Sequence, residues 1–436
     1  MNIIEKAIQL KNHSGFWKYF SNTSWLMAER IFRMTVALLI GVYVARFLGP
    51  DRFGLLSYTN SFVSLFIAIA TLGLDSIVIR ELVKNPESKN ELLGTSFGLK
   101  IIGTILMWFF ILASIPFTEN ETQTNVFIAI IAMAILFQAF NVIDFNFQAK
   151  VKSRYVVQVQ VVQLFVTSLT KLFFIYLEAP LAWFVWVYFI DAFFLACGLV
   201  AIYHFNEGKI WLWRFKLEVA KTLLRDSWPL IFSGVLVSIY VSIDQVMIKQ
   251  MIDTQAVGFY SIATRLSTAW YFIPIAVTGS MFPAILNAKH KKLSVYHKRL
   301  QILYDILVWM AIFLAILIFF LSDTIINVLL GNEYAPSASV LSIAIFAGIF
   351  TNMGLVNNKY FEAENRQKDI LYRSLIGVSV NIFLNIILIQ EYGIYGAAFA
   401  TISAQISTSI LYTYIKKDSR ILFYMFLKCF DIRRIF

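Results

Sequence analysis

Long apolar segments recur along nearly the whole chain, and they restrict its fold more than any other feature. A helix needs roughly 20 apolar residues to cross the hydrocarbon core of a bilayer, and twelve such runs follow one another here. They cover approximately residues 24–47, 54–79, 93–116, 125–145, 157–177, 181–204, 228–250, 257–284, 303–326, 337–360, 370–390 and 392–415. No strand-like alternation competes with them. The sequence therefore predicts an all-α polytopic membrane protein with about twelve transmembrane helices.

Composition excludes the soluble and disordered classes. Charged residues make up 14% of the 436 residues and hydrophobic residues 59%, and the mean hydropathy is +0.71. Soluble domains carry roughly 25% charged residues, and disordered chains need low hydrophobicity. Two cysteines, Cys197 and Cys429, are too few for a disulfide framework or a metal site. No metal and no cofactor is predicted.

Basic residues are concentrated in alternate connections, which predicts the orientation. Most of the 37 Lys and Arg residues lie in one set of segments, for example Arg366, Lys368 and Arg373 at the connection before the predicted span 370–390 and at the start of that span. The alternate connections, such as 117–124 and 327–336, hold almost none. Cytoplasmic loops carry this excess of positive charge. An even number of spans then places both termini in the cytoplasm, and the net charge of +11 reflects topology rather than nucleic-acid binding.

The longest polar connection, residues 205–227, separates two six-helix halves at 1–204 and 228–415. Its Trp, Phe, Leu and Val residues are interleaved with Lys and Arg. This pattern is typical of an amphipathic helix on the inner membrane surface, so a cytoplasmic amphipathic linker is predicted there. Residues 416–436 follow the last span and are predicted to form a basic cytoplasmic tail.

A weak internal repeat links the two halves. A shift of 204 residues aligns GPDRFGLLSYTNSF (49–62) with DTQAVGFYSIATRL (253–266), and it places Gly54 on Gly258. Both segments occupy the outer turn between the first and second helices of their half. Two halves repeated in this way would enclose a central path that opens alternately to either side of the membrane.

Ionisable residues inside the predicted spans mark candidate functional positions, because a charge within a bilayer is costly. The basic candidates are Arg33, Lys100, Lys171 and Arg265, and the acidic candidates are Glu29, Asp75, Asp191 and Asp244. Glu29 and Arg33 are four residues apart, a spacing that predicts a local ion pair. Asp244 and Arg265 are each expected about 10 Å below the outer surface on neighbouring antiparallel helices. We expect them to pair when the path is closed to the outside.

Four segments resemble one family of transporters. They are AERIFRMTVALLIGVYVARFLGPDRFGLLSY (28–58), TLGLDSIVIREL (71–82), DQVMIKQMIDTQAVGFYSIATRL (244–266) and IPIAVTGSMFPAIL (273–286). They are similar to Wzx-type polysaccharide transporters of the multidrug/oligosaccharidyl-lipid/polysaccharide exporter superfamily. The resemblance implies a MATE-like fold in a bacterial inner membrane. It also implies flipping of undecaprenyl-pyrophosphate-linked sugar repeat units to the periplasmic leaflet, for O-antigen (lipopolysaccharide) or capsule assembly.

Such a cargo gives the intramembrane charges specific roles. Pyrophosphate is well matched by Arg, which stays charged when desolvated and donates two hydrogen bonds, so Arg33, Lys100, Lys171 and Arg265 are candidates for a cationic path. Trp25, Tyr43 and Tyr240 are candidate sugar-stacking faces. The chain lacks a G-x-x-x-x-G-K-[ST] loop for ATP, so transport would be coupled to an H⁺ or Na⁺ gradient or driven by product removal. If it is coupled, Asp75, Asp191 and Asp244 are the candidates. Polymerase and chain-length proteins are implied partners.

Two other functions compete with this hypothesis. A multidrug or cation antiporter of the same superfamily would favour acidic residues over basic ones in its path. A membrane enzyme, such as a repeat-unit polymerase or ligase, would need a substantial periplasmic loop for its reactive groups. The predicted outer connections are short, as in residues 178–180, so a transporter is predicted rather than an enzyme.

Overall fold

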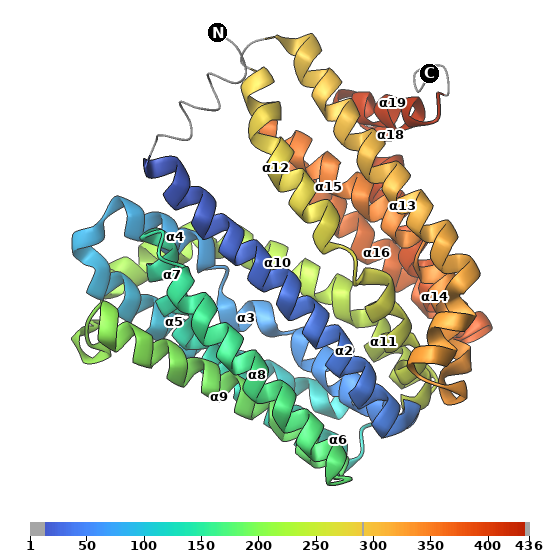
Figure 1. Ribbon diagram of the computed structural model, residues 1–436, viewed down its shortest axis with the longest axis horizontal. Coiled ribbons are helices and arrows are strands. Elements are labelled where there is room, and N and C mark those ends of the chain that lie inside the picture. Colours follow the sequence, from blue (N-terminus) through green and yellow to red (C-terminus); the bar gives the residue numbers. More distant parts are fainter. Residues whose placement is uncertain (1–13, 290–291, 432–436) are drawn as a thin grey trace. The chain divides into compact units, whose positions relative to one another are not determined.

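The computed structural model describes residues 14–289 and 292–431, with side chains from residue 31 onward. Every regular element among them is a helix (Figure 1), which confirms the predicted all-α class. Within residues 14–289 and 292–431, ten helices are long and apolar enough to cross a membrane. A bent pair, Asn332–Ala344 and Ala347–Ala363, makes an eleventh crossing if it counts as one span. The chain is therefore a multi-pass membrane protein.

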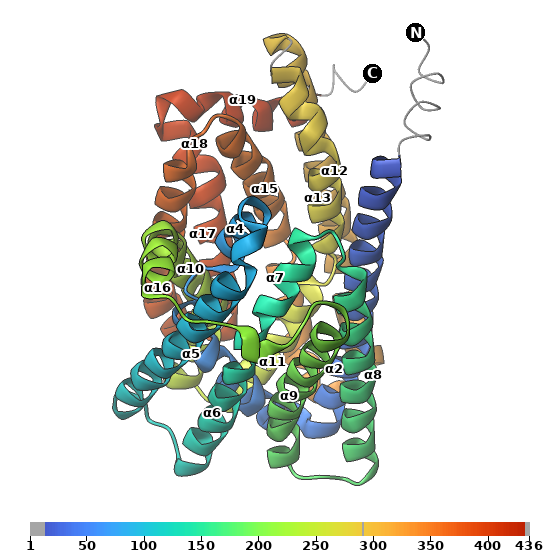
Figure 2. The same cartoon turned by 90° about the vertical axis from the view of Figure 1, so that its left-hand side faces the viewer.

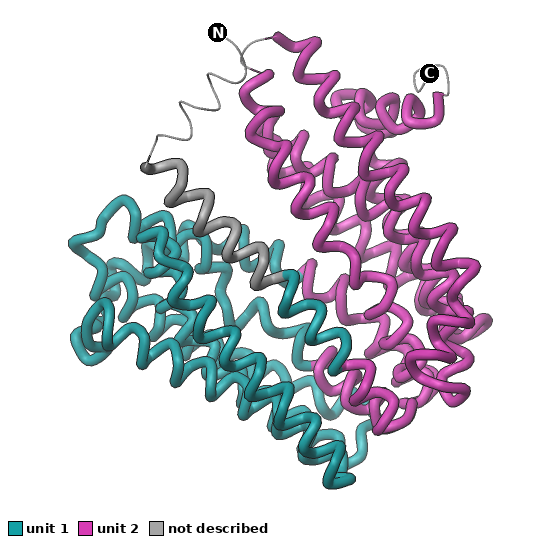
Figure 3. The backbone as a smooth tube through the Cα atoms, in the orientation of Figure 1, with its two compact units in different colours: residues 1–40, 63–235 teal, residues 41–62, 236–436 magenta. Residues whose placement is uncertain are grey.

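The described residues form two compact units, which Figure 3 colours separately. Unit 1 holds the residues up to Ile40 and Val63–Val235. Its helices are the first part of α2 (Ser14–Ser64), α3 (Ile67–Thr71), α4 (Asp75–Lys84), α5 (Lys89–Ser114), α6 (Thr122–Ala134), α7 (Val142–Ala149), α8 (Arg154–Tyr176), α9 (Leu181–Asn206) and the start of α10 (Leu217–Met251). Figures 1 and 2 show α8 and α9 as antiparallel neighbours, as their short connection requires.

Unit 2 holds Gly41–Phe62 and the described residues from Leu236 onward. Its further helices are α11 (Thr254–Thr268), α12 (Phe272–Lys289), α13 (Leu293–Leu329), α14 (Ala335–Ala344), α15 (Ala347–Ala363), α16 (Gln367–Tyr392), α17 (Ile394–Ile406), α18 (Tyr412–Ile415) and α19 (Arg420–Cys429). The predicted halves, 1–204 and 228–415, differ from these units. The end of α2 packs with unit 2, and the start of α10 packs with unit 1.

The two segments aligned by the 204-residue shift lie against each other in unit 2. A Cβ atom built on Gly54 would lie 1.8 Å from the carbonyl oxygen of Thr254. One built on Gly258 would lie 1.9 Å from the carbonyl oxygen of Pro50. Because Pro50 and Thr254 are themselves 204 positions apart, the contact is reciprocal. Only glycine lets two backbones approach this closely.

Two further contacts, from α2 to α10 and from α2 to α11, are reciprocal in the same way. The Ser61 hydroxyl donates to Gln245 Oε1 at 2.8 Å, and a Cβ on Gly41 would lie 2.7 Å from the Nη1 atom of Arg265. Gly41 and Gln245 are equivalent under the shift, as are Ser61 and Arg265. Each pair therefore joins one member of the first repeat to one member of the second. These contacts support the internal repeat.

The predicted span 54–79 is not one helix. The end of α2, then α3 and α4, occupy it in turn. Between α3 and α4, Leu72 and Gly73 take the left-handed conformation, with φ of 51° and 59°. A Cβ on Gly73 would lie 2.8 Å from the Cβ of Leu230 on α10. Hydropathy misses this break because the residues on both sides of it are apolar.

The connection between the halves is also not the helix predicted over 205–227. It contains the 3-10 turn Ile210–Leu212, and its last residues form the beginning of α10. The part before α10 lies across α5, where the Arg214 amide donates to the carbonyl oxygen of Asn90 at 3.1 Å. A Cβ on Gly94 would lie 2.6 Å from the same Arg214 nitrogen. Backbone hydrogen bonds therefore hold this stretch on α5, while the side chains of Trp211, Leu212 and Phe215 stay at least half exposed.

The segment predicted as a tail carries α19, which packs on α13. Gln301 donates to the carbonyl oxygen of Met425 at 2.9 Å, and Trp309 donates to that of Cys429 at 3.1 Å. Leu422, Met425 and Cys429 are buried. This part of the chain is therefore a helix held against unit 2 by its apolar face.

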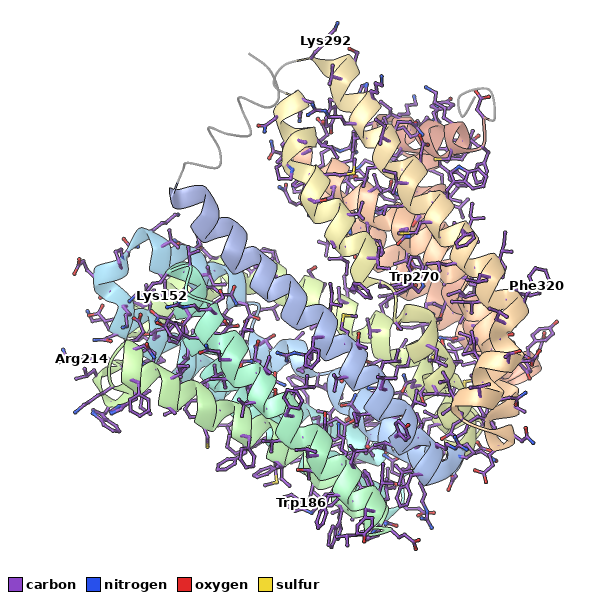
Figure 4. All side chains as sticks on the ribbon, viewed as in Figure 1. Lys152, Trp186, Arg214, Trp270, Lys292 and Phe320 are labelled. Carbon is purple, nitrogen blue, oxygen red and sulfur yellow. The ribbon has the colours of Figure 1, made fainter. Side chains whose placement is uncertain are left out.

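Basic side chains gather at one end of unit 1. Figure 4 shows Lys152 and Arg214 at one end and Trp186 at the other. At the basic end the side chain of Glu207 is buried and makes ion pairs with Lys89, Lys150 and Lys152. This clustering of basic side chains agrees with the alternation of basic connections in the sequence. The basic end is the one predicted to face the cytoplasm.

We predict that Gly54→Ala and Gly258→Ala each destabilise the protein. The added methyl group would overlap a backbone carbonyl oxygen, so α2 and α11 must separate, at a cost of about 1–3 kcal/mol or more. Gly279→Ala is the matched control, because a Cβ at this helical glycine meets nothing within 4 Å. Thermal unfolding of the three variants in detergent measures the effect. Equal stability of Gly54→Ala and Gly279→Ala would contradict the close contact.

Candidate functional site

Asp244 of α10 lies at the centre of a buried polar cluster in unit 2. Its side chain is 6% exposed. The Tyr260 hydroxyl of α11 and the Thr401 hydroxyl of α17 donate to Oδ2 at 2.6 and 2.7 Å. The Asn385 amide of α16 donates to Oδ1 at 2.6 Å. Four helices therefore converge on one carboxylate.

Two asparagines of α16 extend this cluster. Asn385 and Asn381 are four residues apart, so they share a helix face, and the Asn385 amide also lies 3.3 Å from Asn381 Oδ1. Asn385 Oδ1 and Asn381 Nδ2 are buried and have no hydrogen-bond partner among the described residues. A buried polar atom without a partner costs about 1–3 kcal/mol. A carboxylate beside amide and hydroxyl oxygens could hold a proton or a small hard cation.

Arg265 does not pair with Asp244 in this structure. Within the described part of the chain, the carboxylate makes hydrogen bonds with neutral groups and no ion pair. The guanidinium instead lies against Gly41 of α2. The Asp244 carboxylate accepts a hydrogen bond from the Tyr260 hydroxyl. The predicted Asp244–Arg265 pair belongs to an outward-closed state and stays a prediction for that state.

Lys100 and Asp75 form an ion pair in unit 1. Lys100 of α5 is 3% exposed, and its Nζ lies 2.9 Å from Oδ1 of Asp75 on α4. The same Nζ lies 4.6 Å from the centre of the Phe145 ring on α7. The side chain of Asp75 is 57% exposed. Lys100, a predicted cation of the cargo path, and Asp75, a predicted coupling carboxylate, are therefore partners in one ion pair.

The other predicted charges of unit 1 lie apart from this pair. Asp191 of α9 accepts hydrogen bonds from Gln163 and Thr167 of α8, so neutral groups solvate this carboxylate. Lys171 of α8 and Arg33 of α2 are half-buried. The side chains of Glu29 and Trp25 lie outside the described residues, so the Glu29–Arg33 pair stays a prediction.

Arg373 is a further intramembrane charge, and it is not among the candidates predicted from the sequence. This residue counted as part of a basic connection, yet it lies within the predicted span 370–390 and is 5% exposed in α16. Its Nε donates to the carbonyl oxygen of Thr408 at 2.8 Å, and its Nη1 donates to Asn358 Oδ1 at 2.9 Å. Thr408 belongs to a π-helical segment, Ser407–Leu411, a rare geometry that often marks functional sites.

Comparisons with protein families identify two matching stretches of the chain. Residues 20–289 match the family described as "Polysaccharide biosynthesis protein", and residues 229–387 match the family described as "MatE". The capsular polysaccharide biosynthesis protein CapF of Staphylococcus aureus is 21% identical over 412 residues, 91% of this chain and 98% of that protein. The putative O-antigen transporter of Shigella flexneri is 20% identical over 408 residues, 87% of this chain and 93% of that protein.

Solved structures share the fold. The lipid II flippase MurJ in an inward closed conformation matches with a TM-score of 0.74 and 16% identity, over 94% of this chain and 92% of that one. An inward-facing multidrug resistance MATE family transporter matches with a TM-score of 0.69 and 12% identity, over 92% and 96%. These likenesses confirm the predicted MATE-like architecture.

We predict that Asp75→Asn destabilises the protein more than Asp75→Asn combined with Lys100→Met. The single change leaves a buried ammonium without its partner, whereas the double change removes the charge. Because Asp75 is half exposed, we expect a loss of about 1–2 kcal/mol for the single variant, below the range for fully buried pairs. Thermal unfolding of the single and double variants measures the coupling. Glu362→Gln is the control and should change little, because its partner Lys359 is 29% exposed and stays solvated, whereas Lys100 is 3% exposed. Additive losses for Asp75→Asn and Lys100→Met would disprove the coupling.

Proposed function

The chain belongs to the polysaccharide biosynthesis protein family, and on that premise we propose that it flips lipid-linked oligosaccharides. The proposed cargo is an undecaprenyl-pyrophosphate-linked repeat unit that moves from the cytoplasmic to the periplasmic leaflet for O-antigen or capsule assembly. The protein would act in a bacterial inner membrane, together with polymerase and chain-length proteins. The family match over residues 20–289 carries this proposal.

Buried cations support an anionic cargo. A glycan and a pyrophosphate both need polar surroundings inside the membrane, because an unpaired charge in hydrocarbon is expensive. Arg373 in unit 2 is 95% buried and makes no ion pair among the described residues, whereas Lys100 in unit 1 is already paired with Asp75. A buried arginine of this kind would pair with an anionic group of the cargo during the crossing, and helix movements that open the path alternately to each side would move the cargo.

We further propose that Asp244 couples flipping to a proton or sodium gradient. The chain carries no ATP-binding loop, so the energy for uphill transport would come from an ion or from removal of the product. Asp244 is a suitable coupling group because its carboxylate meets side chains from α11, α16 and α17. Binding a proton or a cation there would change the hydrogen bonds among these helices.

A multidrug or cation antiporter is the second candidate. The match of residues 229–387 to the MatE family favours it, and this stretch contains Asp244, Asn381 and Asn385. A carboxylate in a buried cluster suits a cationic cargo as well as a coupling ion. The two candidates differ in the charge of the cargo, so they predict different phenotypes when the gene is deleted.

Deletion of the gene in its host should stop flipping. We expect lipid-linked repeat units to accumulate in the cytoplasmic leaflet and surface polysaccharide to disappear, because the polar head cannot cross unaided. Leaflet-resolved detection of lipid-linked sugars measures this, and re-expression of the wild-type chain should reverse it. Intact surface polysaccharide together with raised sensitivity to cationic drugs would establish the antiporter instead.

Asp244→Asn should reduce flipping in reconstituted vesicles about tenfold or more, equivalent to roughly 1.4 kcal/mol in the activation barrier. The substitution keeps the side-chain size and removes the titratable charge. The remaining rate should no longer respond to proton or sodium gradients. Asp323→Asn, at an exposed position of α13, is the matched control and should behave as wild type. A wild-type rate unchanged when both gradients are collapsed would refute coupling.

A further inference from the structure

A cavity of about 210 Å³ lies among the helices of unit 2, beside Arg373. It is lined by α10, α15, α16, α17 and the π-helical segment 407–411. Its polar lining includes Arg373, Ser374, Tyr240, Asn358, Thr351 and Gln405, and no carboxylate lines it. One positive charge therefore faces this cavity without an acidic residue in its wall.

Arg373 is held so that part of its guanidinium stays available. Nε and Nη1 are occupied by the Thr408 carbonyl oxygen and by Asn358 Oδ1. Among the described residues, Arg373 makes no ion pair, and no hydrogen bond joins its Nη2 to a protein acceptor. The side chain is 95% buried, so bulk water does not screen it. A buried cation fixed by two neutral groups stabilises an anion that reaches it.

We propose that this cavity binds an oxyanion of the transported glycan, a carboxylate or a phosphate, through Nη2 of Arg373. A carboxylate or phosphate accepts strong hydrogen bonds from a guanidinium edge, and the hydroxyls and amides of the lining suit the rest of a sugar. The volume is large enough for one acidic sugar ring and too small for a whole repeat unit. The cavity is therefore a subsite that binds one charged group of the cargo.

The geometry favours an anion over the alternatives. A cationic ligand would meet the Arg373 charge with no acid in the lining to offset it. A neutral ligand would leave the buried charge without a counterion, and a buried unpaired charge is costly. The subsite rests on the proposed flippase function and adds to it one position that binds a charged group of the glycan. Oxyanion binding to the cavity can be measured without transport. A failure of the subsite proposal can therefore be distinguished from a failure of the flippase proposal.

The experiment is a thermal-unfolding titration of the purified protein in detergent. The probes are glucuronate, inorganic pyrophosphate, neutral glucose, and phosphatidylglycerol added to the micelles. We expect at least one soluble oxyanion to raise the unfolding temperature saturably, because a ligand that binds only the folded state stabilises it. Glucose should have no effect.

Three variants test whether Arg373 carries the binding. Arg373→Gln should weaken oxyanion binding about tenfold or more, since a hydrogen bond to a charged group is lost. Ser374→Leu should weaken it similarly by filling the cavity while Arg373 remains. Lys368→Gln is the matched control, because it removes one positive charge from an exposed position of the same helix, and it should bind as wild type.

Three results would overturn the proposal. The first is the absence of a saturable shift with either soluble oxyanion. The second is equal binding by wild type, Arg373→Gln and Ser374→Leu. The third is a shift with phosphatidylglycerol alone, which would assign the cavity to a membrane lipid. Arg373→Gln could fold poorly without its hydrogen bonds to Thr408 and Asn358, and Ser374→Leu keeps the test decisive in that case.

Discussion

The backbone contact between the segments around Gly54 and Gly258 fixes how α2 meets α11, and much of unit 2 depends on it. A carbonyl oxygen occupies the place where a Cβ would be on either glycine, so the two helices have one register. Ser61 lies beside Gln245 on the same side of the contact, and Arg265 lies beside Gly41. Arg265 is therefore held against α2, and the α11 residue that donates to Asp244 is Tyr260.

The membrane-spanning helices could be predicted from hydropathy because the bilayer demands long apolar segments. Eleven of the twelve predicted spans correspond to crossings of the described chain, if the bent pair counts as one. The remaining one, 54–79, is broken at Leu72 and Gly73, where the cause is close packing on α10 rather than a polar residue. The linker is not one continuous helix, because its backbone forms hydrogen bonds with α5 before α10 begins.

The candidate site was predictable only in part. Charge within a span is visible in the sequence, so Lys100, Asp75 and Asp244 were found individually. Their partners depend on how each helix is rotated, which the sequence does not state. Asn381 and Asn385 carry no charge signal, although their spacing places them on one face. Arg373 lies near the start of its predicted span, and a basic residue there resembles an ordinary flanking charge. Its burial and its contact with the π-helical segment required the structure.

The reciprocal glycine contact joins two segments of one chain in the way that an isologous interface joins two subunits. In an isologous dimer, residue i of one subunit contacts residue j of the other and the reverse. Pro50, Gly54, Thr254 and Gly258 satisfy this rule within a single polypeptide. A dimer interface dissociates on dilution, whereas two patches on one chain meet at a fixed effective concentration. The two repeats therefore remain associated at any expression level, and neither can exchange its partner for one from another molecule without first breaking its own.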